Sequence, residues 1–119
     1  MQDFKKLLIW QKSHLLALAI YKVTATFPDV ERYGLISQIR RACVSIPSNI
    51  AEGCGRDGNS EFNRFLHISL GSTAELEYQL LLASDLKLLN ENEYEQLENQ
   101  VHEVRKMLVS FIRKLGVEN

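Results

Sequence analysis

The segment from Gln38 to Gly53 constrains the fold most, because its apolar residues recur at alternating intervals of three and four. Side chains with this spacing lie along one side of an α-helix and form a stripe that packs against a partner. The stripe consists of Ile39, Cys43, Ile46, Ile50 and Gly53. Arg40 and Arg41 fall off the stripe. We therefore predict a helix that packs through one side against other helices.

Pro47 lies inside this segment and permits two interpretations. Within a helix, a proline removes the hydrogen bond to the carbonyl four residues earlier and costs about 3 kcal/mol. Either the helix is continuous and kinked near Pro47, or a new helix begins with Ser45 as its N-cap and Pro47 in its first turn. The apolar stripe keeps its phase across Pro47, which favours the kinked, continuous helix.

Three other segments also have helical periodicity, and short turns separate all four. The expected bounds are Asp3 or Leu8 to Thr26, Tyr33 to Cys54, Asn59 to about Leu86, and a capping box at Asn90 to Gly116. The expected core residues of the first helix are Leu8, Leu15, Leu18, Ala19 and Tyr21. Those of the third are Phe62, Phe65, Leu66, Ser69, Thr73, Leu76, Leu80, Ala83 and Leu86. Those of the fourth are Tyr94, Leu97, Val101, Val104, Leu108, Phe111 and Leu115.

Four amphipathic helices joined by short turns predict an all-α fold, an antiparallel up-down-up-down four-helix bundle. We expect residues 1–119 to form one domain. Gly71, in the middle of the third helix, weakens that helix by about 1 kcal/mol relative to alanine. We therefore expect a backbone, either of the second helix or of a neighbouring subunit, to approach Gly71 closely.

The charge is nearly balanced overall but uneven along the chain. Residues 1–58 carry eight lysines and arginines against five acids, and residues 59–119 carry six against ten, which gives net charges of +3 and −4. This asymmetry favours packing of the early helices against the late ones. Between subunits it favours heterologous contacts.

The sequence favours a cytoplasmic protein with reduced thiols. No apolar run approaches the roughly 18 residues of a transmembrane helix. Trp10-Gln11-Lys12 interrupts the apolar stretch near the amino terminus, which argues against a secretory signal. Cys43 and Cys54 are about 16 Å apart on one helix, too far for a disulfide. We expect no membrane association, and we interpret Cys43 as a small buried apolar residue.

Apolar residues outside the core stripes predict a surface buried between copies of the chain. The expected interface residues are Val44 on the second helix and Ile68, Leu70, Leu81 and Leu82 on the third. The alternative is that these are scattered exposed apolar residues, which are normal on protein surfaces.

A basic surface is the candidate for nucleic-acid binding, either RNA or DNA. Arginine suits phosphate because its planar donors are rigid and always charged. The candidate residues are Arg40, Arg41 and Arg56, with Lys5, Lys6, Lys12 and Lys22 on the first helix. In the alternative, Arg40 and Arg41 pair with acids such as Glu52, Glu75 or Glu77, either within the bundle or across subunits, and the protein is a scaffold that binds only proteins.

No constellation points to catalysis, a cofactor or a metal. His14, His67 and His102 lie on three different helices, and no two have the spacing of a metal-binding pair. Glu75 and Glu77 point to different faces of one helix, so they do not form an acid/base pair. Gly53-Cys54-Gly55-Arg56 follows a helix and not a strand, unlike a phosphate-binding loop. We expect a protein that is not an enzyme.

An ordered series of short motifs resembles a known family over residues 4–89. Together with the segment from Gln38 to Gly53, the motifs are Trp10-Gln11-Lys12, Phe27-Pro28, Tyr33-Gly34-Leu35, Gly55-Arg56, Glu61-Phe62, Phe65-Leu66, Gly71-Ser72 and Glu75-Leu76-Glu77. They are similar to those of the four-helix-bundle proteins encoded in intervening sequences of bacterial 23S rRNA genes, whose relatives include the accessory protein of diversity-generating retroelements. The resemblance implies a homopentamer that binds nucleic acid and a protein partner. The chain departs from the family pattern at Cys43, Cys54 and Gly58, and it is slightly acidic where the retroelement protein is expected to be strongly basic.

Overall fold

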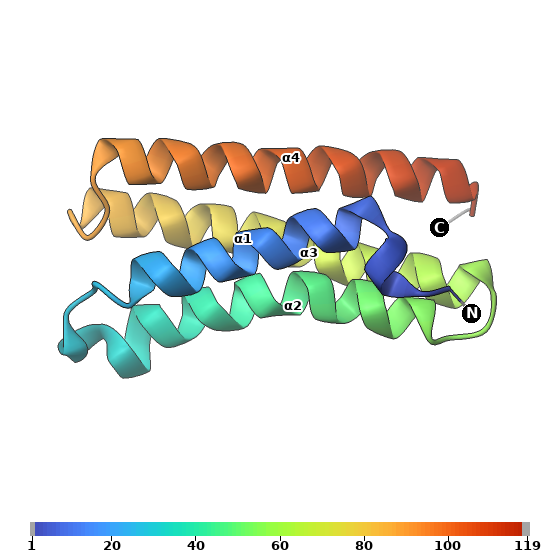
Figure 1. Ribbon diagram of the computed structural model, residues 1–119, viewed down its shortest axis with the longest axis horizontal. Helices are drawn as coiled ribbons and strands as arrows, with labels where there is room; N and C mark the ends of the chain where they lie inside the picture. The colour runs from blue at the N-terminus through green and yellow to red at the C-terminus, as the bar shows by residue number, and fades with distance from the viewer. Residues whose placement is uncertain (1, 118–119) are drawn as a thin grey trace.

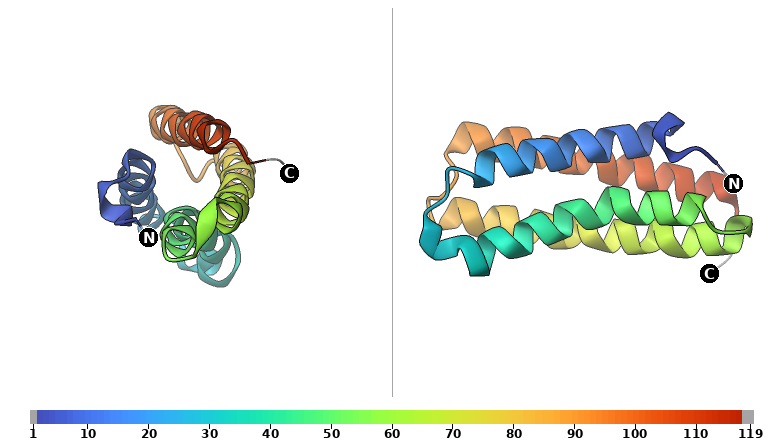
Figure 2. Two further views of the ribbon diagram at one scale, coloured as in Figure 1. Left: turned by 90° about the vertical axis from the view of Figure 1, so that its right-hand side faces the viewer. Right: turned by 60° about the horizontal axis from the view of Figure 1, so that its bottom comes forward.

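The computed structural model places four long helices side by side along the 43 Å axis of the molecule (Figure 1). They are α1 (Leu8–Thr24), α2 (Ser37–Cys54), α3 (Gly58–Asp85) and α4 (Glu91–Leu115). The structure describes residues 2–117, apart from the side chain of Arg32. Each helix packs against its chain neighbours and α1 packs against α4, so the helices close into a ring in the order α1, α2, α3, α4 (Figure 2). The predicted up-down-up-down bundle is confirmed.

Helix α2 is continuous across Pro47, so no new helix begins at Ser45. All five residues of its predicted apolar stripe are buried, and the ring of Pro47 is buried beside them. The Ser45 hydroxyl instead lies 2.8 Å from the Ser72 hydroxyl of α3. The continuous interpretation of this segment is therefore correct.

The connection before α2 is more elaborate than predicted. A 3₁₀ turn, η2 (Asp29–Glu31), and a single π-helical turn, η3 (Arg32–Ile36), precede α2. Gly34 has φ −108° and ψ −105°, outside the helical region, which a residue without a Cβ adopts more readily. The regular helix therefore begins at Ser37 instead of Tyr33. Val30 and Tyr33 stand out from the surface at 86% and 91% exposure.

The prediction for the core side of α1 is wrong. The buried residues are Ile9, Ser13, Leu16, Ala17, Ile20 and Thr24. The predicted Leu8, Leu15, Leu18 and Tyr21 are 44 to 57% exposed, and Ala19 is half-buried. The sequence misleads because two core positions are hydroxyl residues. Ser13 donates to the Trp10 carbonyl at 3.0 Å and Thr24 to the Ile20 carbonyl at 2.7 Å, which lets both polar groups be buried.

The predicted stripes of α3 and α4 are largely confirmed. Every predicted core residue of α3 is buried except Leu86, which is exposed. On α4, the four central residues Leu97, Val101, Val104 and Leu108 are buried, and the three outer ones are half-buried. The Asn90 capping box is present, and Gly116 ends the helix in the left-handed conformation. Helix α3 begins at Gly58, one residue before the predicted start, with Asp57 at the N-cap position.

The close approach between helices occurs at Gly53 and not at Gly71. A Cβ at Gly53 would lie 2.8 Å from the Cδ1 atom of Phe62 and 3.1 Å from the Cβ of Phe65, both on α3. A Cβ at Gly71 would meet nothing within 4 Å among the described residues. The expectation that helix two approaches Gly71 is therefore wrong, whereas approach by a neighbouring subunit stays a prediction.

We expect alanine substitutions at these two glycines to have opposite effects on stability. Gly53→Ala should lower the free energy of unfolding by about 1–3 kcal/mol, because the added methyl group overpacks the contact between α2 and α3. Gly71→Ala should raise it by about 1 kcal/mol, because alanine favours the helix and the site is open. Denaturant unfolding at one protein concentration measures both variants. Equal effects at the two positions would contradict the assigned contact.

Candidate functional site

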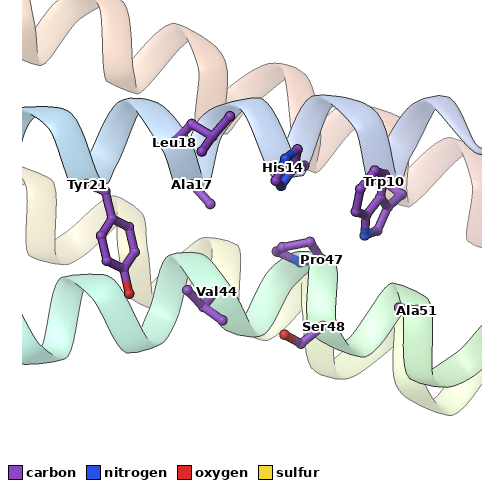
Figure 3. Close-up of a pocket in the computed structure, with 9 residues that line it drawn as sticks. All are labelled: Trp10, His14, Ala17, Leu18, Tyr21, Val44, Pro47, Ser48 and Ala51. Atoms are coloured by element: carbon purple, nitrogen blue, oxygen red, sulfur yellow. The ribbon is translucent and has the colours of Figure 1, made fainter. Parts of the chain in front are cut away.

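A groove between α1 and α2 presents a mainly apolar surface. Its volume is about 480 Å³, and we call it the α1/α2 groove (Figure 3). It is lined by Trp10, His14, Ala17, Leu18, Tyr21, Val44, Pro47, Ser48 and Ala51. It exists because α1 turns Leu16 and Ile20 into the core, which leaves the other apolar side of the helix facing outward over α2.

Aromatic contacts order one end of the α1/α2 groove. The rings of Trp10 and His14 stack with centroids 4.9 Å apart, and Phe4 contacts Trp10 edge-on at 4.9 Å. Such ring contacts fix side-chain orientation in addition to burying area. Figure 3 shows Trp10 and Tyr21 near opposite ends of the groove, with Pro47 between them.

The other end of the α1/α2 groove is basic. A second hollow of about 610 Å³ shares Tyr21 and Val44 with the groove and reaches Arg40 and Arg41. The Arg40 guanidinium lies 4.5 Å from the centroid of the Tyr21 ring, and its Nε donates to the Thr24 hydroxyl at 2.9 Å. Arg40 thus ties α2 to α1, and it forms no ion pair with an acid among the described residues of its own chain. Pairing across subunits, which the alternative interpretation also allowed, stays a prediction. No ion pair of Arg41 is found among the described residues.

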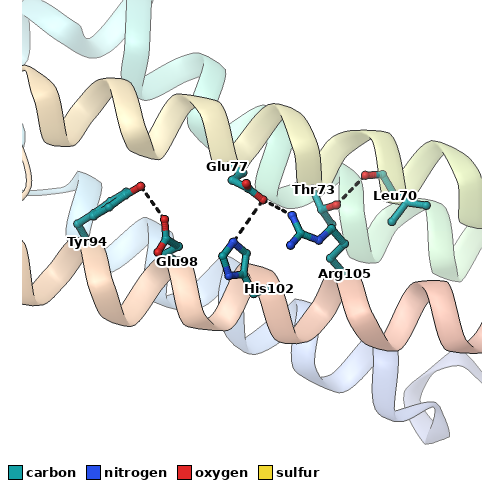
Figure 4. A network of polar contacts seen from close by, with 7 residues as sticks. All are labelled: Leu70, Thr73, Glu77, Tyr94, Glu98, His102 and Arg105. Atoms are coloured by element: carbon teal, nitrogen blue, oxygen red, sulfur yellow. Dashed lines mark hydrogen bonds and ion pairs between the residues drawn. The ribbon is translucent and has the colours of Figure 1, made fainter.

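A surface on α3 and α4, on the opposite side of the bundle, is acidic and apolar. This α3/α4 surface is a hollow of about 370 Å³ lined by Ala74, Glu77, Tyr78, Leu81, Tyr94, Glu98 and Arg105. Tyr78 and Leu81 are 61% and 44% exposed. Glu77 accepts a hydrogen bond from Arg105 and lies 3.5 Å from His102, and Tyr94 donates to Glu98 at 2.7 Å (Figure 4). The contacts of Glu77 with Arg105 and His102 connect α3 to α4, whereas the hydrogen bond from Tyr94 to Glu98 lies within α4.

The hydrogen bond to Glu98, helped by desolvation, raises the pKa of Tyr94 to about 12, from 10.0 in the unfolded chain. Because the folded pKa is the higher one, the stabilisation is complete below pH 10 and is lost as the pH rises towards 12. We expect the free energy of unfolding to fall less steeply across this window in Tyr94→Phe than in the native chain. Denaturant unfolding at a series of alkaline pH values provides the measurement. Parallel slopes in the two proteins would show that Tyr94 does not hold its proton.

The predicted interface residues do not form a single patch. Val44 lines the α1/α2 groove and Leu81 lies on the α3/α4 surface. Ile68 is exposed on a different side of α3, about 140° around the helix from Leu81. Leu70 and Leu82 are half-buried against the core of their own subunit.

The predicted basic residues separate to the two ends of the bundle. Lys5 and Lys6 lie in a short 3₁₀ turn, η1 (Phe4–Lys6), near the end of α2, where the Gln2 amide donates to the Cys54 carbonyl. Arg56 lies at the same end. Lys22 lies in the last turn of α1, at the end that Arg40 and Arg41 occupy. Lys12 lies between the two ends and pairs with Glu103 of α4 at 3.4 Å, a contact between the early and late halves of the chain.

Sequence reasoning missed Arg64, which lies near Arg56 at the end of the bundle where α2 turns into α3. We call this end, with Lys5, Lys6, Arg56 and Arg64, the basic end. The guanidinium groups of Arg56 and Arg64 lie 5.1 and 4.4 Å from the ring centroid of Phe65. Arg56 pairs with Glu52 at 3.4 Å and Arg64 with Glu61 at 3.1 Å, whereas the alternative interpretation names Arg40 and Arg41 as the partners of such acids. The turn between α2 and α3 brings the two arginines together. Its glycines are the signal in the sequence that could have revealed this pairing.

The remaining reactive side chains are occupied in packing. Burial raises the pKa of the Cys43 thiol to about 12 and also raises that of Cys54. Within residues 2–117, no three side chains of the metal-binding types gather into a site. Over the same residues, no helix is long and apolar enough to cross a bilayer.

Comparisons with known proteins agree with this architecture. The model of a protein family described as 23S rRNA-intervening sequence protein matches residues 5–110. A crystal structure from Bacteroides thetaiotaomicron, described as a protein of unknown function from the S23 ribosomal protein family, is similar to this chain with a TM-score of 0.80 and 29% sequence identity. The similarity covers 88% of this chain and 98% of that one. No curated protein sequence matches the chain.

Proposed function

The chain belongs to the 23S rRNA-intervening sequence protein family, and from this premise we propose that it is a non-enzymatic scaffold whose copies assemble into a closed ring. The observation that carries the proposal is the presence of two unlike apolar surfaces on opposite sides of one bundle. In the assembly, the α1/α2 groove of one copy receives the α3/α4 surface of the next. Such a contact is heterologous, and it closes into a ring when the rotation between copies permits.

The charges of the two surfaces support pairing between unlike faces. The α1/α2 groove ends at Arg40 and Arg41, whereas the α3/α4 surface contains Glu77 and Glu98 and only one cation, Arg105, which pairs with Glu77. Complementary charge favours the heterologous register over contacts between two like surfaces, which would bring equal charges together. The uneven charge along the sequence is therefore a property that serves assembly.

The exposed apolar side chains supply the rest of the argument. Leu18, Tyr21 and Val44 at the groove, and Tyr78 and Leu81 on the opposite surface, remain uncovered in one subunit. Clusters of this kind on a small bundle typically mark a contact with another protein. The family resemblance leads us to expect a homopentamer, with five times the 13.7 kDa mass of the chain.

We expect Val44→Asp and Leu81→Asp each to reduce the particle mass measured by light scattering, while the circular dichroism stays helical. Each change places a charge in one of the two proposed surfaces without touching the core. Val109→Asp is the matched control, because Val109 is a similarly exposed apolar residue of α4 outside both surfaces. Its mass should equal that of the native protein.

Mixing the two variants tests the heterologous arrangement directly. Val44→Asp retains an intact α3/α4 surface and Leu81→Asp retains an intact groove, so the mixture should form a heterodimer and nothing larger. If each variant keeps the native mass, or if the native chain is a monomer, ring assembly through these surfaces is wrong.

A second candidate function is binding of RNA or DNA at the basic end of the bundle. Lys5, Lys6, Arg56 and Arg64 gather there, and each of the two guanidinium groups, which pairs with one glutamate and lies on the Phe65 ring, keeps further planar donors for phosphate. In a ring of identically oriented copies, these ends lie on one face. Repetition then provides the charge density that one chain with a net charge of −1 lacks. A protein partner of such a scaffold would meet the remaining faces.

For this candidate we expect the native protein to shift a structured RNA in a gel at low salt, and the shift to weaken steeply as salt is raised. The double variant Arg56→Gln with Arg64→Gln should weaken binding by about tenfold or more in a multivalent ring. Lys22→Gln, at the opposite end and outside both proposed assembly surfaces, is the control for lost charge. If the native protein leaves the mobility of the RNA unchanged at low salt, nucleic-acid binding is wrong. The scaffold that binds only proteins then remains as the proposed function.

A further inference from the structure

A third hollow, between α1 and α4, combines an apolar floor with two lysines on its rim. Its volume is about 410 Å³. We call it the α1/α4 groove. It belongs to neither of the surfaces proposed for assembly, since it lies on a separate face of the bundle. It therefore stays accessible in the proposed ring.

The floor of the α1/α4 groove is a firm part of the bundle. Ile9 is buried in the core, and Met107 and Phe111 are half-buried against it. Phe111 is further held by an edge contact with Phe62, whose ring centroid lies 5.5 Å away. Leu8 stands at the rim with more than half of its surface exposed. An apolar ligand would thus meet a preformed surface, which limits the loss of entropy on binding.

The charged residues that line the α1/α4 groove are both lysines. Lys106 and Lys114 line it from α4, and neither forms an ion pair in the described part of the chain. Glu103, one turn before Lys106, is paired with Lys12 across the two helices at 3.4 Å. The two lysines are therefore uncompensated cations beside apolar surface.

We propose that the α1/α4 groove binds an acidic amphipathic helix of another protein. The Cα atoms of Lys106 and Lys114 are about 12 Å apart along α4, which is a little more than two helical turns. Apolar residues at i, i+4 and i+7 of a docked helix span about the same distance and match the length of the groove. Acidic residues beside these anchors meet the two lysines.

The charge and the apolar floor of the α1/α4 groove fit an acidic amphipathic helix better than nucleic acid or a second copy of the chain. A phosphate backbone would satisfy the lysines but would leave Leu8, Met107 and Phe111 uncovered, so nucleic acid fits the groove poorly. A second copy of the chain has its exposed acidic and apolar residues on the α3/α4 surface. In the proposed ring, that surface is already covered by the α1/α2 groove of the neighbouring copy. The partner is thus a different protein, recognised through a helix that is apolar on one side and acidic at its edges.

The test uses a labelled synthetic peptide as the probe, with leucines at i, i+4 and i+7 and glutamates flanking them, and measures fluorescence anisotropy with the native full-length chain. A second peptide of the same pattern carries lysines in place of the glutamates. We expect the acidic peptide to bind and the basic peptide to bind at least about tenfold more weakly. Absence of binding by the acidic peptide, or equal binding of both peptides, overturns the proposal.

Two variants and a control locate the binding. The double variant Lys106→Glu with Lys114→Glu should weaken the acidic peptide at least about tenfold, whereas Lys22→Glu, at the far end of α1, should change it less than about twofold. Met107→Asp should weaken it similarly, because it places a charge in the floor. Equal losses in the double variant and the control would overturn the groove as the site.

Light scattering of the same variants separates this inference from ring assembly. We expect the Lys106→Glu, Lys114→Glu double variant to keep the native particle mass. A reduced mass would make the α1/α4 groove a contact between copies and would overturn the inference. A monomeric native chain that still binds the acidic peptide through Lys106 and Lys114 would refute ring assembly and leave this inference standing.

Discussion

The close contact between α2 and α3 is the constraint on which the other features of the molecule depend. At Gly53, the backbone of α2 lies against Phe62 and Phe65 with no room for a side chain. Further along, the Ser69 hydroxyl donates to the Ile46 carbonyl at 2.8 Å, directly before Pro47. Small residues and hydroxyls thus let the two helices approach closely while polar groups remain bonded. With α2 fixed in this way, its other flank, bearing Val44 and Pro47, is presented to α1.

Because the four helices pack closely around one core, the faces of the bundle differ in the residues that they expose. The core is completed by one stripe from each helix, and several of the apolar residues beyond the stripes line grooves between neighbouring helices. Three such grooves differ in charge: the α1/α2 groove ends in arginines, the α3/α4 surface holds carboxylates, and the α1/α4 groove is rimmed by lysines. Surfaces of different charge on one small bundle favour different partners, because electrostatic complementarity determines specificity more than total affinity.

The buried residues of a helix could be predicted from the sequence where its apolar residues form one clear stripe. Helices α2 and α4 each have one dominant apolar stripe, so the buried residues along it, the continuity across Pro47 and the Asn90 capping box could be predicted, whereas the burial of Ala42 on α2 was not predicted. Helix α1 has two apolar sides and hides Ser13 and Thr24 in the core, so its orientation, and with it the α1/α2 groove, could not be predicted. The basic residues were identified individually. Their separation to opposite ends, and the addition of Arg64 to one end, depend on how the turns fold back.

The stack of Trp10 on His14 has a practical consequence. Trp10 is the only tryptophan in the chain, and it is half-buried at the wall of the α1/α2 groove. Indole emission responds to the polarity of its surroundings and to a protonated imidazole in ring contact. The native protein therefore carries its own optical reporter at this wall, and its spectrum can register the covering of the groove without any attached dye.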